Sequence, residues 1–231
     1  MHGRLARIDA YGSHPDQWMR IDGDVSADVC VCFVHGGYWR PRYTAELMEP
    51  LTKRVASLDM AAVNIEYRRE ADAEAMQADV RTALRRAAGA FPRASRVVVG
   101  HSAGGQLALV SADEADLIIA LAPVTDLRGG YAAGIGSNAV ADLLGGSPLE
   151  HPAAYDTATP RPSAVPTLLV HGIDDDRVPV SHSRSFADLA RRTEAAVDYF
   201  EFAQLDHMLL IDPDAPHWPS AWAWMRQRLN A

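Results

Sequence analysis

A serine between glycines is the strongest chemical signal in the sequence. Residues 100–104 (GHSAG) fit the pattern G-x-S-x-G, directly after the apolar run 96–100 and directly before a helical pattern. In a strand–turn–helix of this kind, the serine oxygen stands at a helix start, where backbone N–H groups favour developing negative charge. The context predicts that Ser102 is a nucleophile for acyl transfer and that the amide of Ala103 helps to bind the oxyanion. A glycine-rich turn with a bystander serine is the alternative.

A second glycine motif lies further upstream. Residues 35–39 (HGGYW) follow the apolar run 29–34 (VCVCFV). Acyl transfer places negative charge on a substrate oxygen, and removing one backbone donor to it typically costs about 10²–10³ in rate. We expect the amides of Gly37 and Tyr38 to be donors, with Gly36 shaping the turn. An ordinary glycine turn at a strand end is the alternative.

Three successive aspartates compete for the role of the acid. They lie in residues 171–179 (HGIDDDRVP), after another apolar run. Like charges this close would not all be buried, so we expect one internal aspartate and two that face solvent. The spacing H-G-x-x-D-x-x-V-P selects Asp175. A calcium site would need spaced oxygen ligands, which this run lacks.

Nine histidines compete for the role of the base. His207 follows the last apolar run and lies C-terminal to Asp175, so a loop could bring it over Ser102, in the chain order serine, acid, histidine. His217, at the start of the final helical pattern, is the runner-up, and we expect His182 at the surface. In the predicted triad His207 takes the proton of the serine, and Asp175 orients the imidazole.

The elements that must position these residues alternate between strand and helix. Apolar runs predict strands at residues 29–34, 61–66, 96–100, 117–121, 167–171 and 198–202. Helical patterns lie between them at residues 44–58, 72–90, 102–113, 181–192 and 215–229, and Pro50 must kink the first or mark a second start. Near-continuous apolar runs indicate strands covered by helices on both faces. The order predicts a doubly wound, mostly parallel α/β sheet.

The length of 231 residues suits one large α/β domain, so we expect a single domain over residues 1–231. One long irregular stretch, residues 126–164, is rich in Gly and Pro and has a short helical pattern at 138–144. Long loops of this kind are usually functional or disordered. We expect this segment to form a small cap over the carboxyl edge of the sheet.

Composition narrows the range of partners. The net charge is −8, with 30 acidic and 22 basic residues interleaved, which argues against a nucleic-acid or anionic-membrane partner. Neither a secretory signal nor a run of about 18 apolar residues is found, so we expect a cytoplasmic protein with a small-molecule substrate. A homodimer remains open.

The two cysteines, Cys30 and Cys32, lie two apart in a predicted strand. This spacing puts both side chains on one face, so we interpret them as small core residues rather than as a metal or redox site. No cluster of His, Cys and carboxylate residues with ligand spacing stands out. We therefore expect no metal and no cofactor.

Taken together, HGGYW and GHSAGG resemble the arylformamidase (kynurenine formamidase) branch of the α/β-hydrolases, close to the hormone-sensitive-lipase-like esterases. The resemblance extends over most of the chain, including residues 11–12 (YG), 64–68 (NIEYR), 122–127 (APVTDL) and 142–146 (DLLGG). The Tyr-Trp after His-Gly-Gly points to the formamidase branch, although esterases also carry it. The chain departs from the animal enzymes in being shorter and in its glycine-rich cap.

The resemblance implies an α/β-hydrolase fold and hydrolysis of N-formyl-L-kynurenine to kynurenine and formate without a metal. Carried over by motif position, Ser102, Asp175 and His207 would be the triad, and Gly37, Tyr38 and Ala103 the oxyanion donors. We expect the aromatic leaving group to lie against Tyr38, Trp39 or Tyr131.

Three other functions are weighed against the formamidase. A short-chain carboxylesterase acting on acetyl or aryl esters is the alternative within the same class. A peptidase is less favoured because no propeller or other gating domain accompanies the catalytic one. A non-catalytic binding protein derived from a hydrolase is the remote alternative, since such proteins usually lose a triad member.

Overall fold

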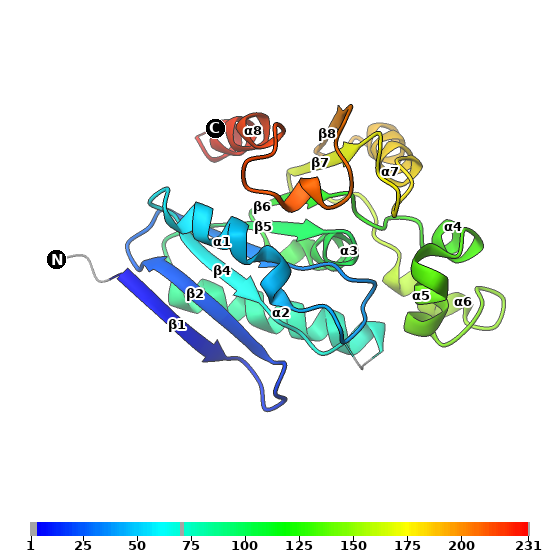
Figure 1. Ribbon diagram of the computed structural model, residues 1–231, viewed down its shortest axis with the longest axis horizontal. Helices are drawn as coiled ribbons and strands as arrows, with labels where there is room; N and C mark the ends of the chain where they lie inside the picture. The colour runs from blue at the N-terminus through cyan, green and yellow to red at the C-terminus, as the bar shows by residue number, and fades with distance from the viewer. Residues whose placement is uncertain (1–3, 70–71, 231) are drawn as a thin grey trace.

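An eight-stranded sheet forms the centre of the computed structural model, which describes residues 4–69 and 72–230 (Figure 1). The strands lie in the order β1-β2-β4-β3-β5-β6-β7-β8. Their bounds are Arg4–Ala10 (β1), Trp18–Asp24 (β2), Val29–Val34 (β3), Ala61–Ile65 (β4), Ser95–His101 (β5), Leu117–Leu121 (β6), Thr167–Gly172 (β7) and Val197–Phe202 (β8). Strands β3 to β8 run parallel, and β1 and β2 pair antiparallel at one edge. The predicted α/β fold is confirmed.

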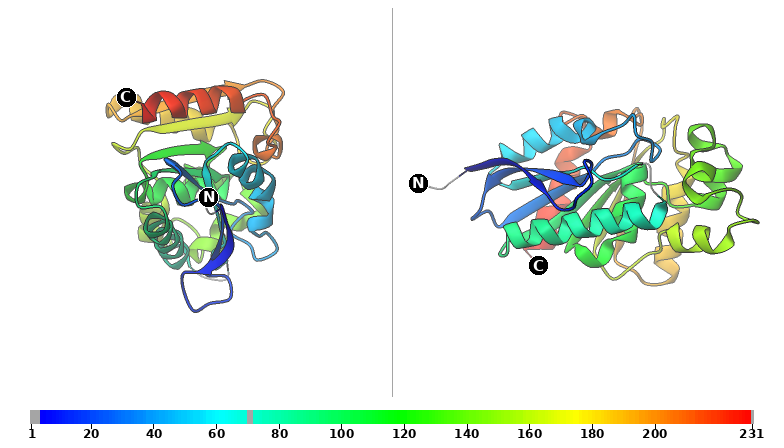
Figure 2. Two further views of the ribbon diagram at one scale, coloured as in Figure 1. Left: turned by 90° about the vertical axis from the view of Figure 1, so that its left-hand side faces the viewer. Right: turned by 90° about the horizontal axis from the view of Figure 1, so that it is seen from below.

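Helices cover both faces of the sheet (Figure 2). The helices α1 (Glu49–Ala56) and α8 (Trp218–Leu229) pack on one face, and α2 (Ala73–Ala90), α3 (Ala103–Val110) and α7 (Ser181–Arg192) pack on the other. The sequence of β3 is apolar throughout because both faces of this strand are covered by helices. Cys30 and Cys32 point to the α2 side, while Val31 and Phe33 point to the α1 side. The two cysteines share one face as predicted, with their sulfurs 3.9 Å apart.

The predicted strands correspond to β3 through β8, with β3 and β6 at the predicted bounds. The helical pattern at residues 44–58 is divided into a 3₁₀ helix, Ala45–Met48, and α1, which has Pro50 in its first turn. The hairpin of β1 and β2 was not predicted. Residues along β2 alternate between buried and half-buried, with Met19 and Ile21 pointing inward, so this strand lacks the continuous apolar run of the others.

Residues 126–164 form three short helices, α4 (Leu127–Ala132), α5 (Ile135–Leu144) and α6 (Pro152–Ala158). They lie at the end of the molecule toward which the parallel strands point, opposite the N-terminus (Figures 1 and 2). Polar contacts tie this segment to the body. The guanidinium of Arg40 donates to the carbonyl of Ser137 (2.9 Å) and to the carboxylate of Asp142 (2.9 Å), and the side-chain amide of Gln106 donates to the carbonyl of Ala158 (2.8 Å).

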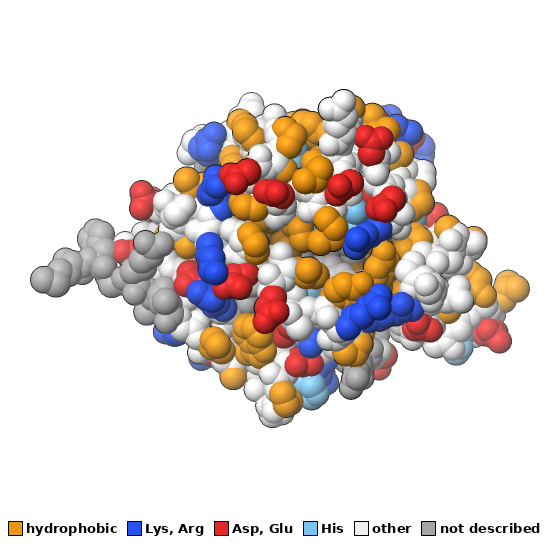
Figure 3. Space-filling model, in the orientation of Figure 1, with side chains coloured by type: hydrophobic (Ala, Val, Ile, Leu, Met, Phe, Trp, Pro, Cys, Tyr) orange, Lys and Arg blue, Asp and Glu red, His pale blue; other side chains and the backbone are white. Residues whose placement is uncertain are grey.

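Charged side chains of both signs are interspersed on the face of the molecule in Figure 3, which carries no extended area of one sign. Several form surface ion pairs, such as Arg20 with Glu49 (3.0 Å) and Arg54 with Asp214 (2.6 Å). Within residues 4–69 and 72–230, no helix is both long and apolar enough to cross a membrane.

Candidate active site

Ser102 occupies the turn between β5 and α3. Its backbone has φ +56° and ψ −119°, a conformation that residues with a side chain rarely adopt. Three backbone hydrogen bonds hold it there: its N–H donates to the carbonyl of Leu121 (2.8 Å), and its carbonyl accepts the backbone N–H groups of Gln106 (3.1 Å) and Val124 (3.3 Å). The serine is therefore fixed by β6 and by the first turn of α3.

Glycine is required on both sides of this turn. A Cβ at Gly104 would lie 2.2 Å from the carbonyl oxygen of Val34, and one at Gly100 would lie 2.4 Å from the carbonyl oxygen of Gly104. Backbone atoms at these separations cannot give way as a flexible side chain could. The nucleophile turn therefore packs backbone to backbone against the end of β3, where the second glycine motif begins.

The loop after β3, residues 35–39, passes directly beside the serine. Gly37 has φ +117°, and Tyr38 and Trp39 both have φ +57°. A Cβ at Gly36 would lie 2.9 Å from the Cβ of Ser102. In the described ranges, the amides of Gly37, Tyr38 and Ala103 donate to no other group of the chain. Free amides on both sides of a serine are what an oxyanion requires.

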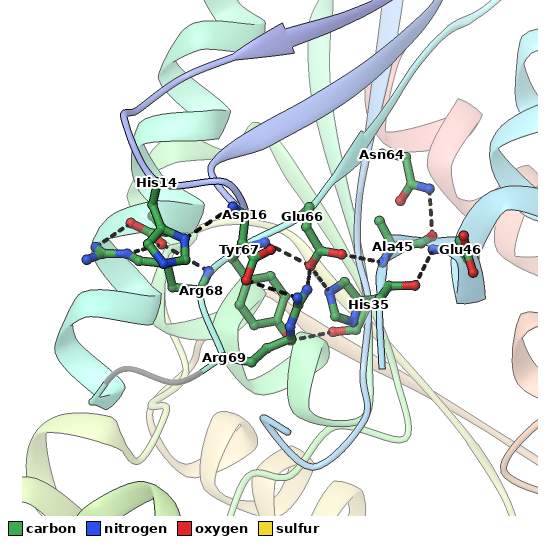
Figure 4. A network of polar contacts seen from close by, with 12 residues as sticks. His14, Asp16, His35, Ala45, Glu46, Asn64, Glu66, Tyr67, Arg68 and Arg69 are labelled. Carbon is green, nitrogen blue, oxygen red and sulfur yellow. Dashed lines mark hydrogen bonds and ion pairs between the residues drawn. The ribbon is translucent and has the colours of Figure 1, made fainter. Parts of the chain in front are cut away.

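A buried carboxylate anchors this loop (Figure 4). The side chain of Glu66, 2% exposed, contacts four groups: Nε2 of His35 (2.8 Å), the amides of Tyr67 (3.0 Å) and Ala45 (2.9 Å), and the guanidinium of Arg69. Nδ1–H of His35 donates to the carbonyl of Gly36 (2.7 Å), and the hydroxyl of Tyr67 donates to the carbonyl of His35 (2.9 Å). The glycine loop is thus held by its own histidine rather than by surface contacts.

His207 and Asp175 form a buried pair, with Nδ1 of His207 2.6 Å from Oδ2 of Asp175. The other carboxylate oxygen accepts the amides of Arg177 (2.9 Å) and Val178 (2.8 Å). Burial alone would raise the pKa of Asp175, but hydrogen bonds from His171 and His207 hold that pKa below its ordinary value. An ionised Asp175 keeps the proton on Nδ1 of His207 and leaves Nε2 free to accept one.

The other two aspartates of the run lie away from the imidazole. Asp174 is exposed and accepts the amide of Gln204 (2.8 Å), and the side chain of Asp176 is 77% exposed. Of the three, Asp175 is the one that contacts His207. This arrangement, one internal carboxylate and two that face solvent, agrees with the charge argument from the sequence.

The competing histidines lie elsewhere. His217 is buried beside Phe202 and Trp218, with ring centroids 6.1 and 4.7 Å away. His182 is buried, so its predicted surface position was wrong. Its Nδ1 accepts the amides of Thr125 and Asp126 (both 3.2 Å), because the first turn of α7 packs under the segment that leads into α4.

Ser102 and His207 line one small cavity of about 30 Å³. Its walls are Gly37, Tyr38, Tyr43, Leu47, His101, Ser102, Arg177, His207 and Met208. A second cavity of about 410 Å³ shares Tyr38 and Arg177 with it. The rest of its wall consists of Ala133, Gly134, Ile135, Gly136, Asp175, Asp176 and Pro179. The predicted nucleophile, base and loop donors therefore surround one space, with a larger one next to it.

Two of the three predicted substrate contacts point elsewhere. Tyr38 lines both cavities, but Trp39 is buried and its indole N–H donates to the amide oxygen of Gln106 (3.2 Å). Tyr131 packs edge-on against Tyr155 of α6 and lies outside the lining of both cavities. Trp39 is therefore a packing residue. Among the wall residues missed from the sequence is Arg177, whose signal was a cation inside the aspartate loop.

A larger cavity, about 800 Å³, lies between α2 and the helices α5 and α6. Residues of its wall include Arg69, Gln77, Gln106, His151 and Thr157, but not Ser102, Asp175 or His207. The hydrogen bond between Gln106 and Trp39 lies at the boundary between this cavity and the glycine loop. This larger cavity is therefore separate from the space around Ser102.

A mostly parallel sheet, a strained serine between strand and helix, and a histidine–aspartate pair together define an α/β-hydrolase. Residues 77–231, more than half of the chain, match the model of the prolyl oligopeptidase family, and the chain belongs to that family. The match includes Ser102, Asp175 and His207, and the protein is a serine hydrolase. A second family model, BD-FAE, matches residues 22–117, which contain the glycine loop and the nucleophile turn. No curated protein sequence matches the chain significantly.

Solved structures agree with this fold at low sequence identity. A carbohydrate esterase from gut microbiota superposes with a TM-score of 0.84 at 15% identity, covering 99% of this chain and 97% of that chain. A thermophilic esterase from Thermogutta terrifontis, with propionate bound, gives 0.74 at 18% identity, covering 97% and 93%. Esterase B from Lactobacillus rhamnosis gives 0.77 at 16% identity, covering 97% and 86%.

Proposed function

We propose that this serine hydrolase is an arylformamidase, which hydrolyses N-formylkynurenine to kynurenine and formate. The observation that carries the proposal is the volume of about 30 Å³ beside Ser102. A formyl group is the smallest acyl group, and every added methylene needs further room in this space. A small acyl group is therefore favoured.

The neighbouring cavity supports an amino-acid leaving group. At about 410 Å³ it falls within the range of small-molecule pockets. Arg177 and Asp176 both line it, with Nε of the arginine 3.9 Å from a carboxylate oxygen of the aspartate. N-formylkynurenine ends in an α-amino acid, which carries a carboxylate and an ammonium group side by side. The arginine suits the carboxylate, and the aspartate suits the ammonium group.

The reaction proceeds in two acyl-transfer steps. His207 takes the proton of Ser102 as the serine oxygen attacks the formyl carbon, and the amides of Gly37, Tyr38 and Ala103 hold the oxyanion. His207 then protonates the aniline nitrogen, which leaves as kynurenine. Water attacks the formyl ester with His207 as base, formate leaves, and the serine regains its proton. Asp175 stays ionised throughout and stabilises the imidazolium.

A short-chain carboxylesterase is the second candidate. An acetyl group is only one carbon larger than a formyl group, and the solved structures named above are esterases. Both candidates share the acyl-enzyme chemistry and differ in the leaving group. Under the esterase alternative, the charges of Arg177 and Asp176 have no role in substrate binding.

We expect N-formylkynurenine and short p-nitrophenyl esters to be cleaved, with activity falling steeply as the acyl chain lengthens. The reason is the small volume beside Ser102. The measurement is kcat/KM for N-formylkynurenine and for acetyl, butyryl and octanoyl esters. A formamide cleaved at least about 100-fold more slowly than the best ester would reject the formamidase, and the esterase would take its place.

Substitution of Arg177 tests the leaving-group argument. We expect Arg177→Gln to lower kcat/KM for N-formylkynurenine about 10–100-fold, since hydrogen bonds to charged groups are worth about 1.5–3 kcal/mol. Activity on p-nitrophenyl acetate, which has no carboxylate, should change by less than about 3-fold. Arg128→Gln is the matched control, because Arg128 pairs with Asp156 on the surface. An equal loss on both substrates would contradict carboxylate recognition.

A further inference from the structure

The imidazole of His101 joins the nucleophile turn to the loop that carries the base. His101 is the last residue of β5, 2% exposed, and lines the cavity of the serine. Its Nε2 lies 3.0 Å from the backbone oxygen of His207, and the two rings lie 4.5 Å apart at 45°. We propose that His101 is a positioning residue, which holds His207 in line with Ser102. This rests on the proposed roles of those two residues.

The geometry determines the tautomer of His101. A carbonyl oxygen only accepts hydrogen bonds, so Nε2 must carry the hydrogen and donate it to His207. Nδ1 of the neutral ring is then an acceptor, and within the described residues it has no hydrogen-bond partner. A Cβ at Gly36 would lie 3.2 Å from this nitrogen. The ring therefore fills the space between the glycine loop and the base loop.

His101 also stays neutral while its neighbour changes charge. Burial is the main cause that lowers the pKa of His101 well below its ordinary value, and the adjacent His207 lowers it further. The other charged groups that face it are Asp175, which raises the pKa, and Arg177, which lowers it. A second charged imidazole would repel the imidazolium of His207. A neutral one can orient the base without competing for its proton.

The base loop needs an anchor of this kind. His207 lies between the end of β8 and a 3₁₀ helix, Leu209–Ile211. Asp175 fixes the ring of His207 at Nδ1, and His101 fixes its backbone at the carbonyl. With the first contact alone, the ring could swing about the carboxylate. Misplacement of a catalytic group by about 1 Å can cost on the order of 100-fold in rate.

Two substitutions at position 101 test the proposal. His101→Phe fills the space but cannot donate a hydrogen bond, and we expect kcat to fall about 10–100-fold with KM changed less than about 2-fold. His101→Gln keeps an amide donor and should retain a higher kcat than the phenylalanine variant. His217→Phe is the matched control, because His217 is likewise buried but lies among Phe202 and Trp218. The substrate is the best p-nitrophenyl ester, so failure of the formamidase proposal does not affect this test.

A spectroscopic measurement separates positioning from general stability. The hydrogen between His207 and Asp175, whose heavy atoms lie 2.6 Å apart, should give a low-field proton NMR signal. We expect His101→Phe to weaken or shift this signal, and His217→Phe to leave it unchanged. A His101→Phe enzyme with wild-type kcat and an unchanged signal would overturn the proposal.

A measurement on the unaltered protein covers the case in which no variant folds. Nitrogen-15 NMR should show His101 neutral at about pH 7, with its hydrogen on Nε2, because burial lowers its pKa. A His101 that titrates at or above the ordinary value for a histidine, or that carries its hydrogen on Nδ1, would overturn the proposal. Labelling of Ser102 by a fluorophosphonate in the same sample tests the nucleophile separately.

Discussion

Replacement of Ser102 by alanine is expected to lower kcat by up to about 10⁶-fold while leaving the fold intact, and His207→Ala should cost about as much. The serine supplies the attacking oxygen, and the imidazole supplies the base, so neither step of the reaction proceeds without both. The measurement is single-turnover hydrolysis of p-nitrophenyl acetate. Circular dichroism of each variant establishes that the structure is retained.

A fluorophosphonate probe gives the control for this prediction. It should label the wild-type protein at Ser102 and leave Ser102→Ala unlabelled. His217→Gln should keep wild-type activity, because that histidine is buried against Phe202 and Trp218. A Ser102→Ala protein with more than a few per cent of wild-type activity would show that another residue is the nucleophile.

Asp175→Asn is expected to lower kcat by about 10⁴-fold, with KM little changed. The carboxylate accepts a hydrogen from Nδ1 of His207 at 2.6 Å, and it stabilises the imidazolium that forms when the serine loses its proton. An asparagine amide can present a hydrogen to Nδ1 instead, which favours the wrong tautomer. Hydrolysis of p-nitrophenyl acetate by the purified variant is the assay.

The other two aspartates supply matched comparisons in the same assay. Asp174→Asn and Asp176→Asn should stay within about 3-fold of wild type, because both side chains are exposed and p-nitrophenyl acetate has no ammonium group for Asp176 to bind. Asp174 bonds to the amide of Gln204, and Asp176 extends into solvent. A large loss confined to Asp174 or Asp176 would show that the acid was assigned in the wrong register.

The convergence of the candidate residues could be predicted because each of them follows a strand. Parallel strands bring their carboxyl ends to one edge of a sheet, so the segments after β3, β5, β7 and β8 must meet there. The prediction therefore needed only the strand order, and near-continuous apolar runs are a strong signal for buried strands. The substrate was less predictable, since the nucleophile motif and the triad order are shared across the whole superfamily.

The sequence could not predict whether a single side chain points into the cavities or into the core. Trp39 follows Tyr38 directly, yet Trp39 is buried beside Gln106 while Tyr38 lines the cavities. The reason is that the loop turns at these two residues, which both have positive φ. Tyr131 packs against Tyr155 instead, and Tyr155 belongs to a helix that is too short and too rich in alanine to be predicted from the sequence. Contacts between segments far apart in the chain determine these side-chain orientations, and such contacts produce no recognisable pattern in the local sequence.

The backbone of Ser102 has a consequence for how the protein can change. A residue other than glycine at φ +56° costs on the order of 1–3 kcal/mol, and glycine would relieve most of that cost. The substitution that removes the nucleophile is thus also one that stabilises the fold. Selection for thermal stability alone would favour Ser102→Gly, and a library screened without an activity assay would accumulate stable, inactive members. Selection for activity must continuously oppose this tendency, as in other proteins whose working site is strained.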